Sequence, residues 1–182
     1  MILLLAGLAL WWGAHLLKRF APAARSNMGE KGRGAIAVLI LLSVVLMVLG
    51  YRSWESFDLV VVPTGLRHLN NLMMLVAIYL MSPAPKKGAL LSGVRHPMLL
   101  GFKLWAMAHL MVNLDPASIV LFGGLLTWAV VEMIVINRQE PDWSPRPRGK
   151  LAMDAMFFVG SIVLMGVIGM LHGMIGPMPF GG

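Results

Sequence analysis

The chain has 182 residues, of which 58% are hydrophobic and only 13% are charged. A soluble domain is nearer half apolar and a quarter charged, so this composition indicates an integral membrane protein. The net charge of +7 comes from basic residues in short segments between apolar runs, a pattern of membrane topology that argues against a nucleic-acid partner. The absence of cysteine excludes disulfides, thiolate catalysis and cysteine metal ligands.

Six apolar segments approach the roughly 17–25 residues that a transmembrane helix needs. The first is expected to be an uncleaved span, because its positive charges, Lys18 and Arg19, follow the apolar stretch. Asp115 and Pro116 are expected to open the fifth, which predicts a short loop and an antiparallel hairpin with the fourth. The sequence therefore predicts one all-α domain over residues 1–182, a bundle with spans at about 2–17, 34–51, 66–82, 97–113, 116–136 and 151–174.

The distribution of basic residues predicts the orientation of this bundle. Most of the 15 Lys and Arg residues lie after the first, third and fifth spans. Because short cytoplasmic loops carry the excess of Lys and Arg, these segments are expected on the cytoplasmic side, with both termini on the other side. The residues concerned are Lys18, Arg19, Arg25, Lys31, Arg33, Lys86, Lys87, Arg95, Arg138, Arg146, Arg148 and Lys150.

Ionisable residues inside spans are costly to insert and are candidates for function. Lys103 and Glu132 lie at similar depths from the cytoplasmic ends of the fourth and fifth spans, so they are predicted to form a structural ion pair. Two alternatives are an anchor for an acidic group and a Lys103 side chain that extends to the interface. The remaining candidates are His15, His109, Asp154 and His172, with His68 and His96 at span boundaries.

Two histidines each follow a tryptophan at helical spacing. His15 lies four residues after Trp11 and three after Trp12, and His109 lies four residues after Trp105. Residues at these offsets share a helix face. Neutral imidazole is a common axial ligand of haem, so one interpretation is a haem site in an apolar bundle. The alternative is two histidines that form hydrogen bonds with neighbouring helices.

The predicted depths of these histidines constrain their pairing. His109 lies about 18 Å from the cytoplasmic start of its helix, whereas His15 is near the cytoplasmic end of the first. One iron could bind both if the first helix continues past Lys18 or the fourth starts later or tilts. Otherwise His68 or His172 would be the better partner of His109.

Arg95 and His96 precede Pro97 at the start of the fourth span. An anion bound at a helix N-terminus is one interpretation of this pair, and polar residues at the level of the lipid headgroups are the other. His96 lies 13 positions before His109, which turns it by roughly 220° at 3.6 residues per turn. The two histidines are therefore expected to face different sites.

Four segments together resemble the NnrU family, whose plastid relative is 15-cis-zeta-carotene isomerase. They read "GAHLL", "LRHLNNLMMLVA", "RHPMLLGFKLWAMAH" and "FGGLLTWAVVEMIVINR". The resemblance implies a polytopic protein of the bacterial inner membrane that binds haem b. It also implies either haem-dependent cis-trans isomerisation of a polyene, as in the carotenoid enzyme, or a role in nitric oxide metabolism and denitrification.

The resemblance places the haem ligands on His15 and His109, beside Trp11, Trp12 and Trp105. Where the plant motif has a cysteine, this chain has Ala106, so a switch between His and Cys ligands is not expected here. The chain is closer to the bacterial NnrU branch. Its expected partners are membrane lipid and a hydrophobic small molecule, with a homo-oligomer as an open alternative. No catalytic residue is identified, and whether the protein is an enzyme stays open.

Two other functions compete with this interpretation. The pattern RHPxxxG, from Arg95 to Gly101, also occurs in membrane methyltransferases such as the isoprenylcysteine carboxyl methyltransferases, where it helps bind S-adenosylmethionine. Those enzymes continue with tyrosines and paired glutamates, whereas this chain has only Glu132 and Glu140 in that region. The third function is a respiratory assembly factor with no chemistry of its own.

Overall fold

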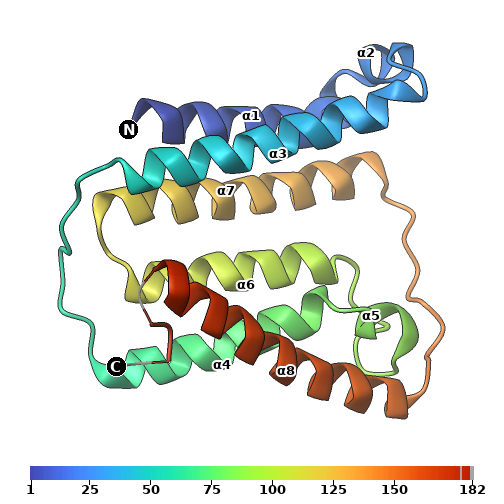
Figure 1. Ribbon diagram of the computed structural model, residues 1–182. Helices are drawn as coiled ribbons and strands as arrows, with labels where there is room; N and C mark the ends of the chain where they lie inside the picture. The colour runs from blue at the N-terminus through green and yellow to red at the C-terminus, as the bar shows by residue number, and fades with distance from the viewer. Residues whose placement is uncertain (177, 181–182) are drawn as a thin grey trace. The chain divides into compact units, whose positions relative to one another are not determined.

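The computed structural model describes residues 1–176 and 178–180, and within these residues it is helical, with no strand (Figure 1). The all-α prediction is therefore confirmed. Each predicted span coincides with one helix to within a few residues. The helices are α1 (Ile2–Phe20), α2 (Pro22–Asn27), α3 (Lys31–Arg52), α4 (Thr64–Met81), α5 (Ala84–Lys87), α6 (Pro97–Val112), α7 (Pro116–Gln139) and α8 (Leu151–Ile175).

Four helices of the described chain, α1, α3, α7 and α8, are long and apolar enough to cross a membrane. The helix α6 is apolar but has only 16 residues, or about 24 Å at 1.5 Å per residue. The helix α4 opens on the polar residues Arg67, His68, Asn70 and Asn71, which lower its hydropathy. The count of six spans and the orientation of the termini therefore stay predictions.

The contacts divide the chain into two compact units, the first of which contains residues 1–59 and 113–139. In this unit α1 packs along α3, and α7 contacts both helices. Gly50 of α3 lies against the backbone of α1, where an added Cβ would be 2.7 Å from Cα of Leu4. Gly7 of α1 lies equally close to Met47 of α3. Small residues at these two positions allow the helices to approach closely, as in many membrane proteins.

Asp115 caps α7, as the sequence predicts. Its Oδ1 accepts a 3.0 Å hydrogen bond from the amide of Ser118, the third residue of the helix. The Ser56 hydroxyl donates to Oδ1, and the Ser118 hydroxyl donates to Oδ2. The hydroxyls of Tyr51 and Ser118 are 2.9 Å apart. This network joins the end of α3 to the start of α7.

The acid stability of the first unit should depend on Asp115. Burial acts to raise the pKa of this carboxyl, but the hydrogen bonds from Ser118 and Ser56 outweigh burial and hold the pKa below its ordinary value of 3.8. A lowered folded-state pKa stabilises the fold above about pH 4 and loses that contribution as the pH falls below it. Thermal unfolding in detergent at pH 6 and pH 3 should show a smaller acid-induced loss for Asp115→Asn than for the wild type. An equal loss, or the same change in the exposed Asp58→Asn control, would refute this role.

The second unit contains residues 60–112 and the chain from Glu140 onward. Here α4 packs against both α6 and α8, and α5 contacts α8. Gly101 of α6 faces α4, where an added Cβ would lie 2.7 Å from the carbonyl oxygen of Ala77. Only residues 113–115 separate α6 from α7, as expected. Because these two helices belong to different units, their packing as a hairpin stays a prediction.

Asp154 in the first turn of α8 has three hydrogen-bond donors. The Tyr79 hydroxyl donates to Oδ1 at 2.7 Å, and the amides of Ala89 and Leu90 donate to Oδ2 at 2.6 and 3.3 Å. The residue is only 2% exposed, and Gly88 leaves room for the carboxylate where a side chain would collide with it. Asp154 thus ties α8 to α4 and to the segment after α5.

A non-helical segment, residues 140–150, follows α7 and pairs with the end of α5 and the chain after it. The amides of Gly149 and Lys150 donate to the carbonyls of Gly88 and Lys87 at 3.0 and 3.2 Å. The amide of Arg146 donates to the carbonyl of Ser92 at 3.1 Å. These bonds hold two basic segments side by side in the second unit.

Candidate functional site

His15 and His109 have the same local geometry. Nδ1 of each ring is 2.9 Å from the carbonyl oxygen of the tryptophan four residues earlier, Trp11 for His15 and Trp105 for His109. Because a carbonyl oxygen only accepts, Nδ1 must carry the proton. In the neutral imidazole the lone pair is then on Nε2, which is the atom that could bind a metal.

Two indole rings surround His15. Its ring centroid lies 4.2 Å from that of Trp11 and 4.7 Å from that of Trp128 on α7. Trp12 lies elsewhere, with Nε1 donating to the carbonyl of Gly124 at 3.2 Å. Trp128 was missed as a site residue, although it lies within the fifth-span segment on which the family resemblance rests. The two indoles pack against the His15 ring, which is half-buried.

His109 lies near the C-terminal end of α6. Its ring centroid is 4.9 Å from that of Trp105, which in turn lies 5.1 Å from Phe102. His172 of α8 is near enough to interact with it electrostatically, whereas His68 is exposed on α4. Both alternative partners predicted for His109 lie in the same unit as it, and their roles as ligands stay predictions.

The predicted ligand pair is divided between the units. His15 belongs to the first unit and His109 to the second, so their pairing on one iron stays a prediction. The helix α1 continues past Lys18, to Phe20, which is one of the three conditions under which that pairing is predicted. His15 then lies five residues, or about 7.5 Å, before the end of its helix.

Glu132 lies beside Arg19, a residue that the sequence predicts in a loop. Its carboxylate is 4.0 Å from Nε of Arg19, and the two side chains are only 12% and 16% exposed. Arg19 follows His15 by four residues and Glu132 follows Trp128 by four, so one face of α1 meets one face of α7. Lys103 lies in the other unit, and its predicted ion pair with Glu132 stays a prediction.

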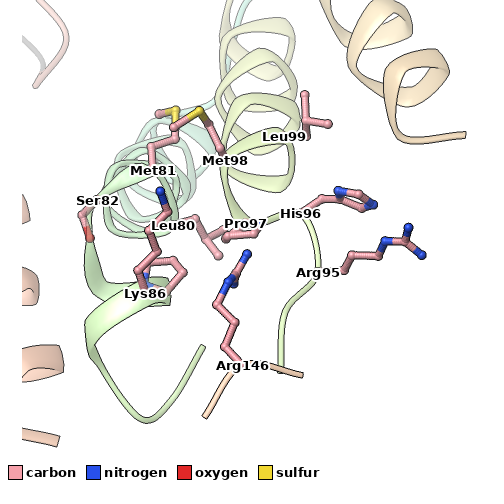
Figure 2. Close-up of a pocket in the computed structure, with 11 residues that line it drawn as sticks. Leu80, Met81, Ser82, Lys86, Arg95, His96, Pro97, Met98, Leu99 and Arg146 are labelled. Atoms are coloured by element: carbon pink, nitrogen blue, oxygen red, sulfur yellow. The ribbon is translucent and has the colours of Figure 1, made fainter. Parts of the chain in front are cut away.

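A cavity of about 230 Å³ lies in the second unit, where α4 ends and α6 begins (Figure 2). The side chains of Lys86 and Arg146 extend toward these helix ends. Those of Arg95 and His96, which also line the cavity, point away from Lys86 and Arg146. Leu80, Met81, Met98 and Leu99 give the cavity apolar walls, and its other lining residues are Ser82, Pro85 and Pro97. Arg95 and His96 are predicted from the sequence as an anion site, but Lys86 and Arg146 are not, because the cavity depends on the pairing of two loops.

Comparison with known proteins decides the family. The family model described as NnrU protein matches residues 3–179, nearly the whole chain. The chain belongs to the NnrU family. No curated protein and no solved structure matches it significantly. The family resemblance drawn from the four segments is confirmed, and the long apolar helices of this NnrU protein indicate an integral membrane protein.

Proposed function

We propose that this NnrU family member is an integral membrane protein that binds haem b through His109 and His15. The observation that supports this most is the shared geometry of the two histidines, in which a tryptophan carbonyl holds the proton on Nδ1. Histidines that bind metals almost always donate their other ring N–H to such an acceptor, which fixes the tautomer and the ring orientation.

The surroundings of the two rings also fit haem. Trp11 and Trp128 pack on His15, and Trp105 packs on His109. Apolar and aromatic side chains of this kind exclude water and tune a haem site. No cluster of three or more His, Cys, Asp or Glu residues that could hold a metal ion occurs among the described residues, so a porphyrin, which needs only axial ligands, fits the donor set better than a bare ion.

The haem would supply the chemistry, and the chain would hold and shield it. When bound, haem provides an iron centre for either role implied by the family resemblance, cis-trans isomerisation of a polyene or nitric oxide metabolism in denitrification. Ala106 carries no ligand atom, so the chain offers histidine alone in this part of α6. His172 is the second candidate for the ligand that shares iron with His109.

The methyltransferase alternative finds less support. It requires Arg95 and His96 to hold S-adenosylmethionine, but Nη2 of Arg95 donates to the carbonyl of Glu140. Both side chains also extend away from Lys86 and Arg146 (Figure 2). An assembly factor without chemistry of its own would bind neither cofactor, and the haem measurement below distinguishes it.

Removing either ligand should weaken haem binding. His15→Gly and His109→Gly are each expected to lower the affinity for haem at least about 10-fold, since loss of groups around a metal site costs 10–100-fold. Added imidazole should restore the absorption spectrum, because it replaces the missing ring in the space it leaves. Haem titration of the purified full chain measures both effects.

Two further variants give the titration its controls. His68→Gly removes an exposed histidine and should leave the spectrum unchanged. His172→Gly should leave it unchanged if His15 is the partner of His109, and should change it if His172 is. A spectrum unaltered in both His15→Gly and His109→Gly would contradict the proposed ligands.

A further inference from the structure

The cavity at the start of α6 is lined by basic side chains and by no carboxylate. Lys86 and Arg146 extend toward it from two different loops (Figure 2). No carboxylate is among its lining residues, and residues 60–112 contain no Asp or Glu. The acids of the second unit, Glu140, Asp142 and Asp154, are not among the lining residues, and Asp154 accepts hydrogen bonds from Tyr79, Ala89 and Leu90.

The fold holds Arg146 in place. Its amide donates to the carbonyl of Ser92, and Nη1 donates to the carbonyl of Val94 at 3.2 Å. A guanidinium that is fixed in this way loses less entropy when it binds an anion. Lys86 is exposed and flexible, so it can adjust to the shape of that anion.

The walls of the cavity show which kind of anion fits. Leu80 and Met81 end α4, and Met98 and Leu99 begin α6, so the basic end of the cavity adjoins an apolar one. The distribution of Lys and Arg predicts that this loop is cytoplasmic, at the level of the lipid headgroups. Basic pockets between helices at this level bind anionic headgroups.

The cavity is separate from the proposed haem ligand on the same helix. Pro97 lies 12 residues before His109, or about 18 Å along the axis of α6. The cavity and the proposed haem ligand are therefore about three helical turns apart along α6.

We propose that this cavity binds a phosphate group, with Lys86 and Arg146 as its charged ligands. A phosphate has oxygens enough to accept hydrogen bonds from both the ammonium and the guanidinium group. The phosphate could belong to an anionic phospholipid or to a soluble phosphate ester. The site goes beyond haem binding, and its failure would leave the histidine ligands untouched.

Binding measurements on the full chain in neutral detergent test this site. One arm titrates phosphatidylglycerol and counts bound lipid by native mass spectrometry. The other titrates glycerol 1-phosphate by calorimetry. The double variant Lys86→Gln/Arg146→Gln is expected to weaken binding at least about 10-fold. The matched control, Lys87→Gln/Arg148→Gln, removes two charges from the same loops outside the cavity and should change it less than about 3-fold.

Each result decides a part of the proposal. If the Lys86/Arg146 double variant binds phosphatidylglycerol more weakly than the control variant does, the phosphate belongs to a lipid. If it loses only glycerol 1-phosphate, the phosphate belongs to a soluble ester. Equal loss in the two double variants, or no loss in either arm, overturns the site. Because Arg146 also holds Val94, Lys86→Gln alone tests the site without disturbing that contact, and Lys86→Arg should restore binding.

Discussion

Replacing Asp154 with alanine is expected to lower the free energy of unfolding by about 3 kcal/mol, one of the two largest stability effects proposed for this chain. The substitution leaves the Tyr79 hydroxyl and the amides of Ala89 and Leu90 without their acceptor. These donors meet Asp154 where water cannot easily replace it, because the side chain of Asp154 is only 2% exposed. Each buried donor left unpaired costs roughly 1–3 kcal/mol. Unfolding in a mixed-detergent titration measures the loss.

Two comparison variants make the Asp154 result specific. Asp154→Asn keeps one carbonyl oxygen, so it should lose less stability than Asp154→Ala. Asp142→Ala removes an exposed acid from the same unit and should leave the unfolding midpoint unchanged. If Asp154→Ala were as stable as Asp142→Ala, the three hydrogen bonds would not stabilise the attachment of α8 to α4 and to the segment after α5.

Gly50→Ala should destabilise the packing of α1 on α3 by about 1–3 kcal/mol or more. The new Cβ would collide with the backbone of Leu4, 2.7 Å from its Cα, and a backbone cannot rotate away as a side chain can. The two helices must then move apart, and they lose the close backbone packing that small residues allow. The same detergent titration measures this effect.

Gly13→Ala is the matched control for Gly50→Ala. An added Cβ at Gly13 of α1 meets no atom within 4 Å, so only the higher helix propensity of alanine remains. That propensity is worth up to about 1 kcal/mol, so the variant should be as stable as the wild type or more so. A loss at Gly13 equal to that at Gly50 would show that close approach is not the cause.

Local signals allowed much of the fold to be predicted. The apolar runs gave six helices in the right places, and Asp115 before Pro116 gave the start of α7, because capping depends on neighbours in the chain. The short helices α2 and α5 were missed, since they carry no apolar run of useful length. The number of membrane spans was harder to predict, because α6 is short for a span and α4 begins with polar residues.

The site was less predictable, because its contacts join distant parts of the sequence. The helical spacing of Trp11 and His15 predicted their shared face, and the ring contact confirms it. Nothing local indicates that Glu132 lies beside Arg19, or that Arg146 reaches the cavity beside Lys86. These pairs depend on how helices pack and how two loops align, which residue spacing does not encode.

The most direct test of haem binding is the haem content of the wild-type chain, purified from cells that can make haem. Absorption spectra and pyridine haemochrome assay give the number of haem b molecules per chain. We expect about one, with a Soret band typical of histidine ligation to the iron. A colourless, haem-free preparation of folded protein would contradict the proposed function.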